Sequence, residues 1–218
     1  MRRLAALGTV GVVLLLLVVA QLVLPGIAAQ SIRDRLSHNG RVQSVSVSAF
    51  PAIELLWHQA DKVVVHVERY KSSMGDLADQ LAQAADAGSL DASATRLDAG
   101  LLTLRDAKLT KRGQQLVGTA SITEADLSAA LPFVQNVQPV ASSNGQLTVR
   151  GTATVLGFSV TLDATVRAEN GRLIVHPDVP LGGLATITVF SDPRIGVKGV
   201  SATSTATGFT VSGQAQLH

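Results

Sequence analysis

The chain has 218 residues, no cysteine, and only 3% aromatic residues. The lack of cysteine excludes disulfides, thiolate nucleophiles, iron–sulfur clusters and cysteine-based zinc sites. The formal net charge is +2, and Arg2 and Arg3 account for all of it. The other basic residues are scattered singly along the chain, so we expect no nucleic-acid partner.

The N-terminal segment is apolar and long enough to cross a membrane. Residues 4–24 contain only Thr9 and Gln21 as polar residues, and as a helix they would match the roughly 30 Å hydrocarbon core of a bilayer. The two arginines before them favour a cytoplasmic N-terminus. We therefore predict that residues 1–30 are a signal or membrane anchor. The protein is then a single-pass protein of the cell membrane with an extracytoplasmic domain, or is exported after cleavage at a small-residue pattern.

Residues 31–218 are expected to form one domain, because no linker rich in Pro, Gly or Ser divides them. The nearest candidate, residues 140–145, is expected to be an ordinary loop. At the start of the domain, residues 26–36 have the spacing of an amphipathic helix that continues from the apolar run after Pro25. Its apolar stripe would consist of Ile27, Ala28, Ile32 and Leu36.

The first half of the domain combines strands with two helices. One helix is expected at residues 73–87, where Ser73 is the N-cap and Asp76 stands at the capping-box spacing. A second helix is expected to begin at Thr123, with Asp126 three residues on, and to end before Pro132. The apolar residues 52–57 should form a turn or a short helix. Extended segments are expected at residues 41–49, 61–70, 94–97, 100–110 and 115–122.

The second half is a run of strands separated by turns. The clearest alternation of apolar and polar residues falls at residues 157–168, and Asn170-Gly171 is a strong two-residue hairpin signal. Such a succession is typical of an antiparallel sheet and not of βαβ units. We predict an α+β fold with one long, curved antiparallel sheet, a half-barrel wrapped around one or two helices and preceded by a membrane helix. The remaining strands are expected at residues 146–156, 172–176, 184–190, 197–206 and 208–217.

No motif for catalysis, phosphate binding or metal binding is evident, so we predict a protein that is not an enzyme and needs no cofactor or metal. His66 shares a strand face with Glu68, which is more typical of a solvated pair than of half a site. His176 and Asp178 flank a proline, which is more typical of a turn than of an acid–base pair. An enzyme with dispersed carboxylates stays an alternative, and it would depend on Asp163 or Asp178.

The remaining chemical feature is the apolar face of the C-terminal strands. Either the protein's own helices cover this face, or part of it forms a groove for acyl chains. The side chains that would line such a groove are those that alternate with polar neighbours. They are Leu147, Val149, Val160, Leu162, Val166, Phe209 and Val211.

Several stretches together resemble an actinobacterial envelope family, the LmeA-like phospholipid-binding proteins. The most specific stretch is residues 118–127, a predicted strand that runs into Thr-Glu-Ala-Asp-Leu. Trp57-His58 departs from the family, which tends to have a small residue such as Gly there. The other resembling parts are the N-terminal segment with residues 27–36, the strand ending at Phe50-Pro51 with Leu55-Leu56 beyond, and residues 61–67 and 100–110.

This resemblance implies a lipid-transfer-like fold that binds phospholipid or lipid-linked intermediates at the outer face of the plasma membrane. The implied role is support of glycolipid assembly or lipid transport in the cell envelope. The expected partners are a phospholipid or lipid-linked glycan, the membrane, and possible envelope-assembly enzymes. The alternative is an envelope scaffold protein with a fully packed sheet and no lipid cavity, which would bind partners through exposed residues such as Arg150 and Arg167.

Overall fold

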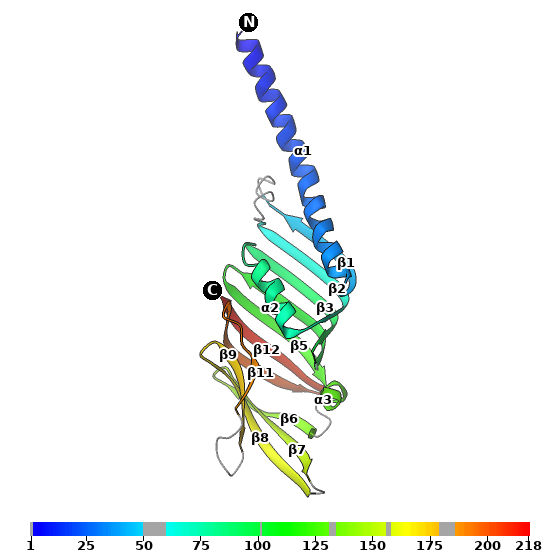
Figure 1. Cartoon of the computed structure of the whole chain (residues 1–218), viewed down its shortest axis with the longest axis vertical. Helices are drawn as coiled ribbons and strands as arrows, with labels where there is room; N and C mark the ends of the chain where they lie inside the picture. The colour runs from blue at the N-terminus through cyan, green and yellow to red at the C-terminus, as the bar shows by residue number, and fades with distance from the viewer. Residues whose placement is uncertain (1, 50–59, 101, 131–133, 156–157, 179–185) are drawn as a thin grey trace.

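The computed structural model describes residues 2–49, 60–100, 102–130, 134–155, 158–178 and 186–218. The expected turn at residues 52–57, the strand stop at Phe50-Pro51 and the helix end at Pro132 lie outside these residues. Within them, strands dominate and form two sheets (Figure 1). The sequence analysis predicted a single sheet, and that expectation was wrong.

The larger sheet has the strand order β1-β2-β3-β4-β5-β12-β11. All its neighbouring strands are antiparallel except β2 and β3, which are parallel. The last two strands of the chain therefore return to pair with β5 from the first half. Its strands are β1 (Gly40–Ser48), β2 (Lys62–Ser72), β3 (Ser89–Ala99), β4 (Leu102–Arg112), β5 (Gln115–Thr123), β11 (Ile195–Thr205) and β12 (Gly208–Leu217).

The N-terminal helix α1 (Arg2–Ser37) packs on the outer strand β1 of the larger sheet (Figure 1). The helix is continuous through Pro25. The helix predicted at residues 26–36 is therefore confirmed as the last part of α1. Of the predicted apolar stripe, Leu36 packs against the core, whereas Ile27 is 59% exposed. In the part of the chain whose side chains the structure describes, no helix is both long and apolar enough to cross a membrane.

Helix α2 (Met74–Gln83) connects β2 to the parallel strand β3, and it lies over one face of the larger sheet (Figure 1). The predicted capping box is confirmed, because the Asp76 amide donates to Ser73 Oγ at 3.1 Å and the Asp76 carboxylate accepts from the Ser73 amide. The parallel pair corrects the expectation of a purely antiparallel sheet. A helical crossover places the next strand in the same direction, which a hairpin cannot do.

The core of the larger sheet is filled by the protein's own side chains. Val65, Val67 and Leu90 of β2 and β3 are each at most 9% exposed, and Leu77 and Leu81 of α2 pack against their cluster. A second cluster places Ala78 of α2 against β5, β11 and β12, through Leu116, Ile195 and Leu217. Helix α2 thus covers this sheet from its first half to its last strands.

Lys111 on β4 is the most buried charged residue of the described chain, with 1% of its surface exposed. Its Nζ donates to the carbonyl of Ala85 at 2.9 Å and to that of Ala87, just beyond the end of α2. Burial lowers the pKa of Lys111, and the nearby Asp86 partly opposes this shift. The lysine therefore satisfies two backbone carbonyls of the turn that follows the helix.

The short helix α3 (Glu124–Ala130) follows β5 and is held by the predicted N-cap. The Asp126 amide donates to Thr123 Oγ1 at 3.1 Å. Arg105 on β4 then donates to both carboxylate oxygens of Asp126, at 2.7 and 3.2 Å. This bidentate pair, together with the hydroxyl of Thr123, lowers the pKa of Asp126 and fixes the helix to the sheet.

The smaller sheet has the antiparallel order β10-β9-β8-β7-β6. The turns Asn144-Gly145 and Asn170-Gly171 have positive φ at both residues, as a two-residue hairpin requires. Residues 140–143, expected to be part of a loop, belong to a strand that the sequence analysis missed. The strands are β6 (Val134–Ser143), β7 (Gln146–Val155), β8 (Phe158–Glu169), β9 (Arg172–Asp178) and β10 (Ile187–Phe190).

The two sheets join where these hairpin turns meet the free edge of β11. The Val197 amide donates to the Gly171 carbonyl at 2.8 Å, and the Val200 amide donates to the Gly145 carbonyl at 3.0 Å. Glycine is required at this contact, because a Cβ added to Gly199 would lie 3.1 Å from the Cα of Gly145. The turns therefore close an edge that would otherwise present unpaired backbone groups.

We expect Gly199→Ala to destabilise the protein by roughly 1–3 kcal/mol, because the new methyl group would meet backbone that cannot rotate away. Gly213→Ala on the neighbouring strand is the matched control, since no atom lies within 4 Å of its added Cβ. Urea unfolding of the full chain in detergent, followed by circular dichroism, measures both. Equal effects of the two substitutions would contradict the tight contact.

We expect Asp126→Asn to lower the free energy of unfolding at neutral pH. In this variant the free energy should also fall less steeply as the pH is lowered. The folded-state pKa of Asp126 is lowered, so its stabilisation is complete above the unfolded-state value and is lost as pH falls through the folded-state pKa. Unfolding free energies between pH 7 and pH 2.5 measure this. Glu124→Gln, at an exposed position of the same helix, should leave the slope as in the wild type.

Candidate functional site

Five of the seven predicted lining residues lie on one face of the smaller sheet. Leu147 of β7 stands opposite Val166 of β8, and Val149 follows Leu147 by two residues. Leu162 and Val160 stand opposite Gly151 and Ala153, which continue the same alternation. Directly opposed residues of antiparallel strands point to the same side of the sheet, so the five side chains share a face.

This face continues over β9 and β10, from which no lining residue was predicted. Val175 stands opposite Val166 on one side and Ile187 on the other, and Leu173 stands opposite Ala168. The strand and its hairpin with β8 were predicted, but Ile174 between Leu173 and Val175 breaks the alternation with polar neighbours by which the other lining residues were chosen. We define the apolar face of the smaller sheet as Leu147, Val149, Val160, Leu162, Val166, Leu173, Val175 and Ile187.

The apolar face is covered at one end and accessible at the other. Leu147, beside the hairpin turns, is 6% exposed, whereas Val160, near the opposite end of β8, is 43% exposed. The covered end lies under β11, since the Ala202 amide donates to Ser142 Oγ at 3.3 Å and Ser142 stands opposite Leu147. At the outer strand, Ile187 is 55% exposed.

The other two predicted residues, Phe209 and Val211, lie on β12 of the larger sheet. Phe209 is 7% exposed and stands opposite Ile122, and Val211 stands opposite Ala120. The structure therefore does not place them on the apolar face. They share its alternating pattern, but the pairing of β12 with β5 assigns them to a different sheet.

The opposite face of β7 and β8 is polar, and Arg150 and Asp163 on it form an ion pair. Arg150 donates to both carboxylate oxygens of Asp163, at 2.7 and 2.8 Å, and this contact lowers the pKa of Asp163. The hydroxyls of Thr152 and Thr161 lie 3.3 Å apart on the same strands. A carboxylate held ionised in this way is a poor candidate for a proton donor.

The histidines with candidate acidic partners are engaged elsewhere. His176 accepts a hydrogen bond from Arg167 at Nε2, at 3.2 Å, and its Nδ1 lies 3.0 Å from Thr186 Oγ1. The carboxylate of Glu68, the neighbour of His66 on its strand, pairs with Arg41 at 3.2 Å. Among the described residues, no three His, Asp or Glu side chains gather as a metal site.

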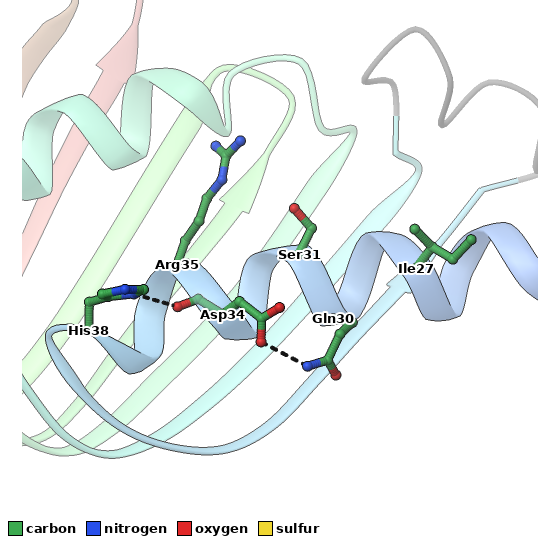
Figure 2. A pocket seen from close by; sticks show the side chains of 6 residues that line it. All are labelled: Ile27, Gln30, Ser31, Asp34, Arg35 and His38. Atoms are coloured by element: carbon green, nitrogen blue, oxygen red, sulfur yellow. Dashed lines mark hydrogen bonds between the residues drawn. The ribbon is translucent and has the colours of Figure 1, made fainter.

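A separate open hollow lies beside α1 (Figure 2). Gln30 Nε2 donates to Asp34 Oδ1 at 2.8 Å, and His38 Nδ1 lies 2.8 Å from the Asp34 carbonyl oxygen. All the lining side chains are exposed, so the hollow lies open to solvent and does not enclose a ligand. None of the seven predicted lipid-lining residues contributes to this hollow. It is lined by Ile27, Gln30, Ser31, Asp34, Arg35 and His38.

The comparisons with known proteins bear on what the apolar face binds. No curated protein and no solved structure matches the chain. A family model described as LmeA-like phospholipid-binding matches residues 17–212, which include both sheets. The resemblance seen in the sequence is thereby confirmed, and a family of this description suggests lipid binding without catalysis. The chain belongs to the LmeA-like phospholipid-binding family.

Proposed function

We propose that this protein binds a phospholipid or lipid-linked intermediate without covalent chemistry, with the acyl chains lying on the apolar face of the smaller sheet. The observation that carries the proposal is the exposure of this uncharged face at two places: Val160 near the far end of β8 is 43% exposed, and Ile187 on the outer strand β10 is 55% exposed. The family description supplies the class of ligand. Exposed apolar surface of this kind usually marks a binding site.

The dimensions of the face suit hydrocarbon. The strand β8 has 12 residues, which at about 3.4 Å per residue gives roughly 40 Å. The acyl chains of one leaflet reach across half of a hydrocarbon core of about 30 Å. Burying about a dozen methylenes at ~0.8 kcal/mol each gives roughly 10 kcal/mol before the costs of association. Such an energy retains a lipid while still allowing exchange.

The two faces of the smaller sheet would have different tasks. The apolar face would take the acyl chains, and the polar face, with its paired Arg150 and Asp163, would stay in water. The carboxylate of Asp163 on this face is held ionised by Arg150, which supports binding without catalysis. The exposure of Val160 and Ile187 also speaks against the alternative of a scaffold protein with a fully packed sheet.

We further propose that residues 4–24 hold the protein in the plasma membrane, with both sheets outside the cytoplasm. The support comes from the apolar sequence of this run and from the two arginines before it. An exposed apolar stripe on α1 runs from the end of this segment to just beyond it, because Val19, Val23 and Ile27 are 48%, 49% and 59% exposed. In this location the bound lipid would serve envelope glycolipid assembly, with envelope-assembly enzymes as possible partners.

A photoreactive phospholipid, with the reactive group in its acyl chain, tests the binding surface. With the full chain in nanodiscs, we expect crosslinks on residues 151–167, identified by mass spectrometry after tryptic digestion. Val160→Glu should reduce these crosslinks at least tenfold, because a carboxylate beside hydrocarbon costs several kcal/mol. Crosslinks on residues 4–24 serve as the internal reference for lipid access.

The matched control is Thr161→Glu, which places the same charge one residue away on the polar face. It should leave the crosslinks on residues 151–167 unchanged. Crosslinks confined to the N-terminal segment, or an equal loss in both variants, would contradict binding on the apolar face.

A further inference from the structure

The N-terminal helix and the smaller sheet lie at opposite edges of the larger sheet. Helix α1 packs on β1, the first strand in the sheet order, and the hairpin turns of the smaller sheet dock on β11, the last. Figure 1 shows the N-terminus at one pole of the molecule and the ends of β7 and β8 at the other. The exposed end of the apolar face therefore points away from α1.

The separation is large on the scale of a bilayer. Six strand spacings of about 4.8 Å lie between β1 and β11, which gives roughly 29 Å. Val160 stands nine residues along β8 from Glu169, beside the docked turn, and at about 3.4 Å per residue this adds roughly 30 Å. The two lengths run in the same general direction (Figure 1).

Several contacts hold this arrangement together. The two backbone hydrogen bonds from Val197 and Val200 fix both hairpin turns on β11. Arg194, just before β11, donates to Asp79 of α2 at 2.6 Å and to Asp192 at 2.8 Å. Phe190 of β10 packs against the cluster around Ala78 of α2. Ties at several points oppose folding of the smaller sheet back toward α1.

The exposed end of the smaller sheet has the chemistry of a membrane-contacting surface. Val160, close to this end of β8, is 43% exposed. None of the side chains that define the apolar face is charged. A charge in this position would be costly in hydrocarbon.

We propose that the smaller sheet meets a phospholipid bilayer other than the one that holds α1, and exchanges lipid there. This inference rests on the proposed function, from which it takes both the anchor and the lipid-binding face. The protein then spans the space between its own membrane and a facing lipid surface. Its anchor lies in the first membrane, and Val160 lies close to the facing lipid surface.

The absence of cysteine permits a direct test with single labels. Full-length Ser31→Cys, Val160→Cys and Ile187→Cys each carry a donor dye and are reconstituted into vesicles of phosphatidylcholine and phosphatidylglycerol. Acceptor-labelled lipid is placed either in the same vesicles or in added vesicles that lack protein. Ser31 is exposed on α1 and reports the near end of the molecule.

With acceptor in the same vesicles, we expect strong energy transfer at position 31 and at least fivefold weaker transfer at position 160. With acceptor only in the added vesicles, transfer should appear at positions 160 and 187 and not at 31. Strong transfer from position 160 to its own vesicle would overturn the inference, as would a lack of transfer to the added vesicles. If the photoreactive phospholipid still labels residues 151–167 in that case, lipid binding stands and only the second membrane is refuted.

Discussion

The arrangement of this protein depends on the backbone contact between β11 and the two hairpin turns of the smaller sheet. An edge strand has amides without partners, and here the carbonyls of Gly145 and Gly171 accept from Val200 and Val197. The contact is tight on the glycine side of each turn, since a Cβ added to Gly199 would lie 3.1 Å from the Cα of Gly145 and one added to Gly171 would lie 3.3 Å from the Cα of Gly196. This seam sets where the smaller sheet stands and which end of its apolar face is covered.

The apolar faces of the two sheets are covered to different extents. In the larger sheet, α2 and the end of α1 pack against the interior through Leu77, Leu81 and Leu36. In the smaller sheet, the described residues leave Val160 and Ile187 largely exposed. The sequence left open whether helices fill the sheet or a groove remains. The structure gives the first answer for the larger sheet, and the second is the basis of the proposed lipid site.

Charge is distributed to match this division. The described ion pairs lie on polar surfaces, at a helix junction or between neighbouring strands, such as Arg150 with Asp163 and Arg105 with Asp126. Lys111, the most buried cation among the described residues, donates to carbonyls just after α2, on the larger sheet. The polar groups of the described chain thus stabilise the scaffold, while the candidate ligand surface is hydrocarbon alone.

Local sequence determined the elements and their faces. Some features depend only on residues close in the chain, so they can be predicted without the fold. They are the capping residues Ser73 and Thr123, the turn at Asn170-Gly171 and the alternation along β8. The family, too, was evident from short motifs. Only the tertiary structure decided that β12 pairs with β5, which removes Phe209 and Val211 from the predicted face, and that β2 and β3 are parallel. It also added the strand β6 and assigned the predicted strands β9 and β10 to the smaller sheet. Strand order is set by hydrogen bonds between distant segments, and an alternating pattern shows that a strand has an apolar face without showing which sheet that face belongs to.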